Sequence, residues 1–206
     1  MRAAELDAVL VDAYGTLMTL ADPVPALAGV LDAHGAPRAT AVVRAGVEAE
    51  IAYYAPRASE GHDAASLLRL QRDCAAVFLE VVDAPLDPVA FAPAYVGALR
   101  FEELPGVSTS LDRARGLGLG LAVVANWDLT LRERLAEVGL ARFFPCVVHA
   151  AGKPAPDGLL RAAVELGVAP ERALYIGDTE SDRVAAGNAG VHFTPAPLPA
   201  ALSTLT

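Results

Sequence analysis

Two kinds of hydrophobic pattern follow one another along the chain. Short continuous apolar runs occur at Ala8–Val11, Leu119–Ala125, Pro145–His149 and Ala173–Gly177, and polar residues follow the runs. Such runs are typical of strands that are buried on both faces of a sheet. Between the later runs, apolar residues recur at helical spacing. Strands that alternate with helices predict an α/β fold, in which a parallel sheet carries helices on both faces.

The second half of the chain contains most of these predicted elements. Helices are predicted at Val107–Leu117, Asp128–Leu140, Pro156–Leu166 and Ser181–Ala189, and a fifth short strand at Val191–Thr194. Gly190 is the expected C-terminal stop of the last helix. For the tail, Pro195–Thr206, the pattern predicts no element beyond a last turn.

The stretch between the first two apolar runs has helical spacing alone. Helices are predicted at Pro23–His34, Arg38–Tyr54, Ala64–Val82 and Asp87–Leu99. Asp63 is the expected N-cap of the third helix, and Pro88 lies in the first turn of the fourth. The sequence therefore predicts an all-helical block that is inserted into an α/β core.

A carboxylate ends the first apolar run. Asp12 follows Val11 directly, and Gly15 and Thr16 come shortly afterwards. The ligand crevice of an open α/β sheet lies beyond the carboxyl ends of its strands, so Asp12 is placed where a nucleophile or a metal ligand would stand. A strand that ends in an Asx-type turn explains this stretch, taken alone, equally well.

Polar residues after the later strands distinguish these two interpretations. Asn126, Lys153 and Asp178 follow those runs, and Asp182 comes four residues after Asp178. This order resembles that of the haloacid dehalogenase superfamily of hydrolases, which includes many phosphatases. The matching segments are Asp12–Leu17, Val124–Asn126, Lys153–Pro154 and Gly177–Asp182, and the resemblance covers nearly the whole chain.

The resemblance implies a Rossmann-like core with a helical cap. The α/β hydrolase core would consist of residues 1–18 and 102–206, and the cap of residues 19–101. In the superfamily, such a cap closes over the active site, excludes water and selects the substrate. The alternative is that the inserted helices only cover a face of the sheet.

The motif residues also predict a reaction. Asp12 is the candidate nucleophile, because a carboxylate can attack phosphorus or a halide-bearing carbon and form an ester that water later hydrolyses. Clustered carboxylates raise one another's pKa and need a counter-charge, which Mg²⁺ supplies because it prefers oxygen ligands. By resemblance, Asp12 and Asp178 bind the metal directly with the backbone carbonyl of Tyr14, and Asp182 supports it. Helix capping is the alternative role for Asp178 and Asp182.

Lys153 is the only lysine in the chain. It is expected to hold Asp12 ionised and to neutralise charge that develops on the transferred group. A solvated surface lysine is the alternative. The resemblance assigns Tyr14, Thr16 and Asn126 to substrate binding, with Thr16 and Asn126 donating hydrogen bonds to substrate oxygens.

Two positions depart from the phosphatase pattern. Tyr14 stands where phosphatases of the superfamily carry a second aspartate as general acid and base. A phenol ordinarily ionises near pH ~10 and is a poor base at neutral pH. Ala125 replaces a serine or threonine that usually donates to the substrate. The string Asp12–Leu17 instead resembles the 2-haloacid dehalogenases, although those generally lack the acidic Asp178 and carry an aromatic residue where Leu159 stands.

Three functions stay open on these grounds. The favoured one is Mg²⁺-dependent hydrolysis of a small phosphate monoester, with low efficiency, because Asp178 and Asp182 are both present. Metal-independent dehalogenation of a 2-haloacid is the second, because of Tyr14. The third is a catalytically impaired, ligand-binding member of the superfamily, because of Tyr14 together with Ala125.

Composition restricts the partners. The 206 residues carry a formal net charge of −9, which argues against nucleic-acid binding. No apolar stretch is long enough to span a membrane, and the first apolar run is too short for a signal peptide, so we expect a cytoplasmic protein. Cys74 and Cys146 lack metal-ligand spacing. A small, anionic molecule is the expected substrate, and the oligomeric state is left open.

Overall fold

The computed structural model describes residues 5–203, and it divides the chain into two compact units. The first unit combines the chain up to Thr19 with the chain from Glu102 onward, and the second is Leu20–Phe101. The interpretation of the units as a hydrolase core and a cap stays a prediction.

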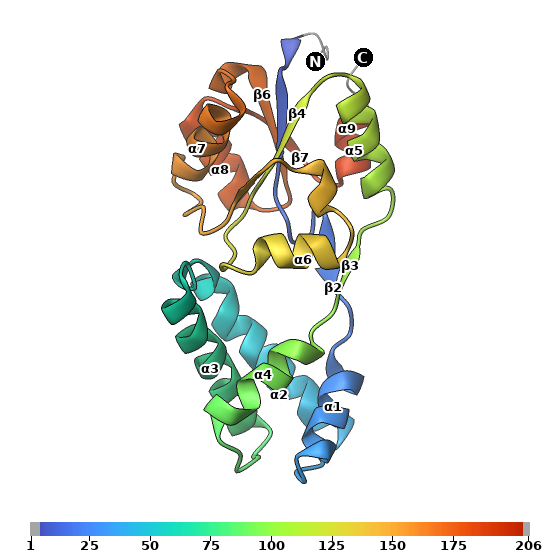
Figure 1. Cartoon of the computed structure of the whole chain (residues 1–206), viewed down its shortest axis with the longest axis vertical. Coiled ribbons are helices and arrows are strands. Elements are labelled where there is room, and N and C mark those ends of the chain that lie inside the picture. Colours follow the sequence, from blue (N-terminus) through green and yellow to red (C-terminus); the bar gives the residue numbers. More distant parts are fainter. Residues whose placement is uncertain (1–4, 204–206) are drawn as a thin grey trace. The chain divides into compact units, whose positions relative to one another are not determined.

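A five-stranded sheet forms the centre of the first unit (Figure 1). Its strands are β1 (Ala8–Val11), β4 (Gly120–Val124), β5 (Cys146–Val148), β6 (Ala173–Gly177) and β7 (His192–Pro195). They lie in the order β5-β4-β1-β6-β7, and every neighbouring pair is parallel. All four residues of β1 are buried, as expected for a central strand that is covered on both faces. The predicted parallel α/β sheet is therefore confirmed.

The register of the sheet brings the ends of three strands together. Val11 of β1 lies opposite Val123 of β4 on one side and Ile176 of β6 on the other. Because the strands are parallel, the residues that follow them leave the sheet at the same edge. Asp12 and Asp178 are thereby gathered at this edge.

Among residues 5–203, five α-helices belong to the same unit as the sheet. They are α5 (Val107–Gly116), α6 (Leu131–Glu137), α7 (Asp157–Leu166), α8 (Glu180–Ala189) and α9 (Leu198–Ser203). Helices α7 and α8 pack small residues such as Ala162 and Ala185 against the face that carries Leu10, Ala122 and Tyr175. Figure 1 shows these two helices on one side of the sheet and α5 and α9 on the other.

Two predictions for this unit were wrong. The helix expected from Asp128 begins only at Leu131, because the Asp128 carboxylate accepts hydrogen bonds from the backbone and hydroxyl of Thr130 and forms a turn there. The tail, for which no helix was expected, contains α9, which buries Leu198 and Leu202 in the first unit.

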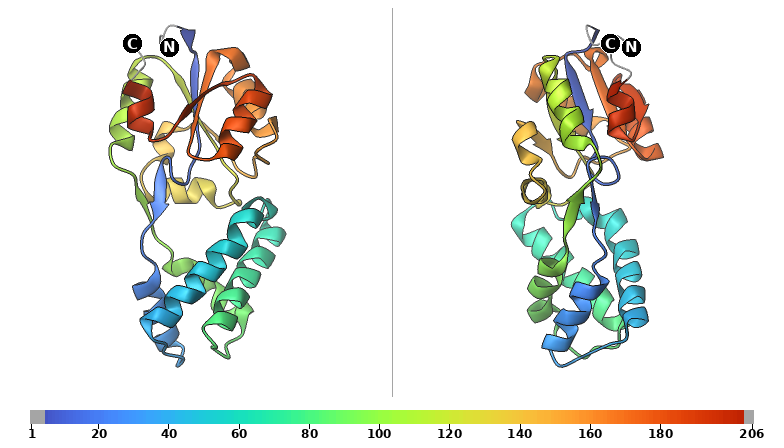
Figure 2. Two further views of the ribbon diagram at one scale, coloured as in Figure 1. Left: turned by 180° about the vertical axis from the view of Figure 1, so that it is seen from behind. Right: turned by 90° about the vertical axis from the view of Figure 1, so that its right-hand side faces the viewer.

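The second unit is helical (Figure 2). It contains α1 (Val24–Ala33), α2 (Thr40–Tyr54), a 3-10 helix (Ala55–Glu60), α3 (Ala64–Val81) and α4 (Pro88–Ala98). Asp63 caps α3 as predicted, through a capping box with Ser66. Helices α2 and α3 run side by side, and Gly46 permits this, since a Cβ there would lie 2.6 Å from Val82 and 2.9 Å from Phe78.

A small second sheet was not predicted. Strands β2 (Met18–Leu20) and β3 (Phe101–Glu103) pair with each other where the chain passes from one unit to the other. Three residues are too few to give a readable alternation of polar and apolar positions. Within residues 5–203, no helix is long and apolar enough to cross a membrane.

Candidate active site

Asp12 leaves the end of β1 inside the protein. It is 6% exposed, and its backbone N–H donates to the carbonyl of Ile176 in β6. Burial raises the pKa of its carboxyl group to about 6, although the charge of Lys153 opposes this shift. The nearby Asp182 carboxylate adds to the rise. A buried carboxylate in this position depends on Lys153 to remain ionised near neutral pH.

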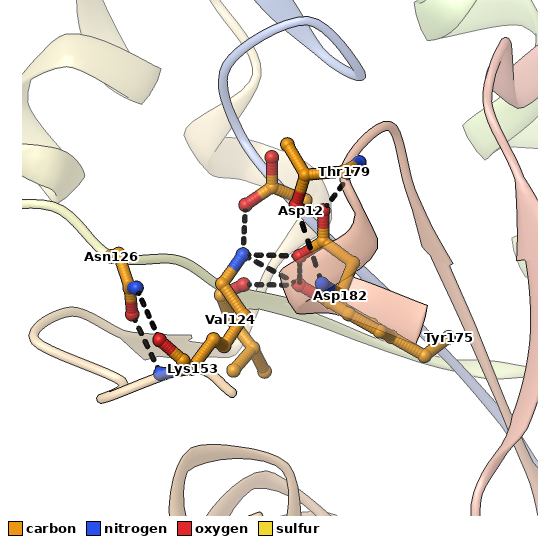
Figure 3. A network of polar contacts seen from close by, with 7 residues as sticks. All are labelled: Asp12, Val124, Asn126, Lys153, Tyr175, Thr179 and Asp182. Atoms are coloured by element: carbon orange, nitrogen blue, oxygen red, sulfur yellow. Dashed lines mark hydrogen bonds and ion pairs between the residues drawn. The ribbon is translucent and has the colours of Figure 1, made fainter. Parts of the chain in front are cut away.

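The ammonium group of Lys153 lies at the centre of the site (Figure 3). Its Nζ donates to Oδ1 of Asp12 at 2.6 Å, to Oδ1 of Asp182 at 2.5 Å and to the hydroxyl of Tyr175 at 2.9 Å. The lysine side chain is 5% exposed. Lys153 is thus a buried partner of Asp12, which excludes the alternative of a solvated surface lysine. Its role in the reaction stays a prediction.

Asn126 holds the backbone of Lys153. Its Nδ2 donates to the carbonyl of Lys153, and its Oδ1 accepts from the backbone N–H of the same residue, both at 2.9 Å (Figure 3). This amide was expected to bind the substrate. Its two bonds fix the loop that presents the lysine. An amide nitrogen has two N–H donors, so substrate binding by Asn126 stays a prediction.

Asp182 is fully buried, and both of its oxygens are engaged. Oδ1 accepts from Lys153 and Tyr175, and Oδ2 accepts from the backbone N–H and the hydroxyl of Thr179. Burial would raise the pKa of Asp182, but the charge and hydrogen bond of Lys153, with the bonds from Thr179, bring it below its usual value. Contacts with Lys153, Tyr175 and Thr179 thus hold both oxygens in place, so Asp182 supports the site. Asp182 also forms a capping box with Thr179 at the start of α8. The residue therefore contributes both to the helix cap and to the site.

Asp178 is the exposed member of the acidic group. Partial burial raises its pKa, and Asp182 adds to this effect. The chain of Gly15 passes so close that a Cβ there would lie 2.2 Å from Oδ2 of Asp178, and Gly15 has a φ of +75°. A larger residue would be strained at this φ and would have to displace the Asp178 carboxylate.

The three carboxylates have the chemistry of a magnesium site. Asp12, Asp178 and Asp182 each offer an oxygen atom, and these atoms lie within 4.8 Å of one another. Lys153 supplies one positive charge against these three carboxylates. Hard oxygen donors with an excess of negative charge fit Mg²⁺, and Asp12 and Asp178 are the residues that would hold it. The assignment of a metal here stays a proposal.

A comparison with known protein families shows to which family the chain is related. The haloacid dehalogenase-like hydrolase family matches residues 6–190, which is most of the chain. The chain belongs to this family.

Individual relatives of this haloacid dehalogenase-like hydrolase match shorter segments. A β-phosphoglucomutase of Mycobacterium bovis is 46% identical over 88 residues, which cover 39% of this chain and 33% of that protein. A phosphoglycolate phosphatase of Escherichia coli K12 is 34% identical over 91 residues, which cover 42% of this chain and 36% of that protein. The chain therefore spans about a third of the length of the curated relatives that it matches.

The fold has solved counterparts. The L-2-haloacid dehalogenase of Xanthobacter autotrophicus superposes with a TM-score of 0.63 and 24% sequence identity, over 91% of this chain and 76% of that chain. The likeness establishes the α/β, Rossmann-like fold of the hydrolase family.

Two further predicted residues, Tyr14 and Thr16, lie within the first matching segment, Asp12–Leu17. Tyr14 is 49% exposed, and its ring centroid lies 6.5 Å from that of Trp127, which is buried. Thr16 is buried, and among the described residues its Oγ1 has no hydrogen-bond partner. A buried hydroxyl without a partner is unusual in proteins. This supports the proposed role of Thr16 as a substrate donor, which stays a prediction.

Sequence reasoning missed Tyr175. Its side chain is fully buried on β6, and its hydroxyl contacts Lys153, Asp182 and the carbonyl of Val124. The available signal was a hydroxyl group inside an otherwise apolar strand, two residues before Gly177.

Proposed function

We propose that this chain is a Mg²⁺-dependent phosphatase that acts on a small phosphate monoester through Asp12. The observation that carries the proposal is the buried contact between Lys153 and Asp12, with Asp178 beside them in one acidic group. A buried carboxylate that is held by a lysine and carries a raised pKa is a candidate for catalysis. The phosphatase named among the relatives supports the same substrate class.

The chain's own residues account for the covalent steps of this reaction. An oxygen of Asp12 attacks phosphorus, the phosphorus–oxygen bond to the alcohol breaks, and the alcohol oxygen leaves with the electron pair. Water then attacks the aspartyl-phosphate, which releases phosphate and restores the carboxylate. Lys153 keeps Asp12 ionised and oriented. Bound Mg²⁺ would offset the negative charge of the phosphate and of the acidic group.

Tyr14 determines which leaving groups are expected to react. The residue stands where related phosphatases carry a second aspartate, so the leaving oxygen lacks that general acid. General acid catalysis contributes about 10²–10⁴-fold to such steps. An aryl phosphate, whose leaving group needs no proton, should therefore react faster than an alkyl phosphate.

The test is hydrolysis of an aryl phosphate and an alkyl phosphate by the purified chain, with Mg²⁺ and then with excess chelator. We expect turnover of the aryl ester that needs Mg²⁺, and its loss in Asp12→Asn, which also controls for contaminating phosphatases. Turnover that persists in Asp12→Asn or in excess chelator contradicts the proposal. The absence of turnover with both esters contradicts it as well.

Tyr14 also favours a second candidate, a metal-independent 2-haloacid dehalogenase, since a halide leaves without a proton. Its test is halide release from 2-chloropropionate in the presence of chelator, again with Asp12→Asn as the control. If neither assay shows turnover, the third function, ligand binding without catalysis, becomes the best explanation.

We further propose that the helical unit, Leu20–Phe101, is the cap that selects the substrate. Its position in the chain between the first and second motifs supports this assignment, together with the family to which the chain belongs. The substrate itself is expected to be a small anion, because a single ammonium group and a metal would bind it.

A further inference from the structure

Tyr175 joins the apolar sheet to the polar site. The residue lies in β6 opposite Leu10 of β1, and its ring is part of the buried cluster that α7 and α8 cover. Its hydroxyl reaches the carbonyl of Val124, the last residue of β4, at 2.9 Å. Since β1 separates β6 from β4 in the sheet, the phenol bridges two strands that do not pair.

The hydrogen-bond donors of Lys153 can be counted. An ammonium group has three N–H donors and no acceptor. The three partners are Asp12, Asp182 and Tyr175, at 2.6, 2.5 and 2.9 Å (Figure 3). The three N–H donors are therefore matched by three acceptors in this structure.

The donors and acceptors of Tyr175 can be counted in the same way. A phenol hydroxyl has one proton and also accepts. Lys153 can only donate, so the tyrosine oxygen accepts from it. The tyrosine proton then goes to the carbonyl of Val124 or to the carboxylate of Asp182, both of which lie at 2.9 Å. The hydroxyl therefore anchors the ammonium group to the sheet.

We propose that Tyr175 is a positioning residue, whose hydroxyl takes the third ammonium proton of Lys153 and fixes the ammonium group against Asp12. Lys153 then acts on the reaction from a fixed position beside the nucleophile. The contacts carry this assignment whatever the reaction is, and only the kinetic part of its test rests on the proposed phosphatase function.

The single lysine of the chain allows a direct test. Protein labelled with ¹⁵N at the lysine Nζ gives one side-chain ammonium signal. In the wild type we expect a signal that exchanges slowly with water, because the group is buried and makes three bonds. In Tyr175→Phe, which keeps the ring and removes the hydroxyl, we expect the signal to shift and its hydrogens to exchange at least about tenfold faster.

Tyr95→Phe is the matched control. Tyr95 is a second fully buried tyrosine, but it lies in α4 of the helical unit. Its variant should leave the Nζ signal unchanged, and thermal unfolding of both variants verifies that they fold. An Nζ signal in Tyr175→Phe that coincides with the wild type overturns the proposal, as does the lack of a slowly exchanging signal in the wild type.

Kinetics add a second readout. If the chain hydrolyses an aryl phosphate, Tyr175→Phe should lower kcat about tenfold and leave KM within about twofold, because the hydroxyl orients the nucleophile and does not touch the substrate. An unchanged kcat in Tyr175→Phe would overturn the assignment. A wild type without turnover contradicts the phosphatase function alone, since the Nζ signal still tests Tyr175.

Discussion

At the scale of single residues, two glycines of the site stand beside carboxylates where a side chain has no room. A Cβ on Gly177 would lie 2.5 Å from Cγ of Asp182, and one on Gly15 would lie 2.2 Å from Oδ2 of Asp178. The carboxylates themselves therefore occupy the space that any larger residue would need.

Gly15→Ala is expected to damage the site more than the fold. Its positive φ costs about 1–2 kcal/mol for a residue with a Cβ, and the new methyl group must push the Asp178 carboxylate aside. Gly35→Ala is the matched control, because Gly35 has a similar φ of +72° with open space around its Cβ position.

Both glycine variants should lose similar stability in thermal unfolding. Gly15→Ala alone should lose Mg²⁺-dependent turnover, by about 100-fold, because a displaced ligand spoils the geometry of the reacting groups. Equal activity in the two variants would show that Asp178 is not a required ligand.

At the scale of elements, the helical unit buries a carboxyl group in its own core. Glu50 of α2 is 7% exposed, and Cys74 of α3 and Tyr95 of α4 face it. Burial raises the pKa of Glu50 above its usual value, although these two neighbours oppose the shift. The packing of three helices thus creates a site where the protonated acid is favoured.

This burial makes the stability of the chain depend on pH. The folded state binds the Glu50 proton more tightly than the unfolded state, so the free energy of unfolding falls as pH rises from about 4.5 through the raised pKa. Glu50→Gln removes the charge and should raise the thermal midpoint relative to the wild type at about pH 8, with a smaller gain at about pH 4.

Glu48→Gln serves as the control for Glu50→Gln, because Glu48 is an exposed glutamate on the same helix. Its effect on the midpoint should not grow between these two pH values. A gain in Glu50→Gln that is the same at both values would mean that Glu50 does not titrate in this range.

At the scale of the whole molecule, the site concentrates negative charge in a chain that already carries a formal net charge of −9. Lys153 compensates one of the three carboxylates that lie together. Metal binding would relieve the remaining repulsion in the folded state, whereas an unfolded chain does not assemble the three groups. Binding should therefore be visible as stability, without any turnover.

Mg²⁺ is expected to raise the thermal midpoint of the wild type, by an amount that grows with its concentration. At a Mg²⁺ concentration of about 100 times the dissociation constant, binding should increase the free energy of unfolding by about 2.7 kcal/mol. Asp178→Asn should abolish this response, while Asp157→Asn, which changes an exposed aspartate in the first turn of α7, should keep it. An unchanged response in Asp178→Asn would place any metal elsewhere.

Local signals explain which elements could be predicted from the sequence. The continuous apolar runs located β1, β4, β5 and β6, and helical spacing located the main helices, because both patterns lie within one stretch of chain. The turn at Asp128 was missed because a side-chain hydrogen bond competes there with the first turn of the helix. Strands β2 and β3 were missed because each has only three residues, and only their pairing in the folded chain identifies them as strands.

The sequence by itself determined the alternation of strands and helices, the family, and the acidic residues and the lysine that follow the strands. Each of these depends on residues that are close together in the chain. Only the tertiary structure decided how these groups are paired. It assigned Asn126 to the backbone of Lys153 and added Tyr175 to the ammonium group. Lys153 and Asp12 are 141 residues apart in the chain, so their contact exists only once the parallel sheet has brought the strand ends together. The same holds for the burial that raises the pKa of Asp12 and for the lysine charge that opposes this rise.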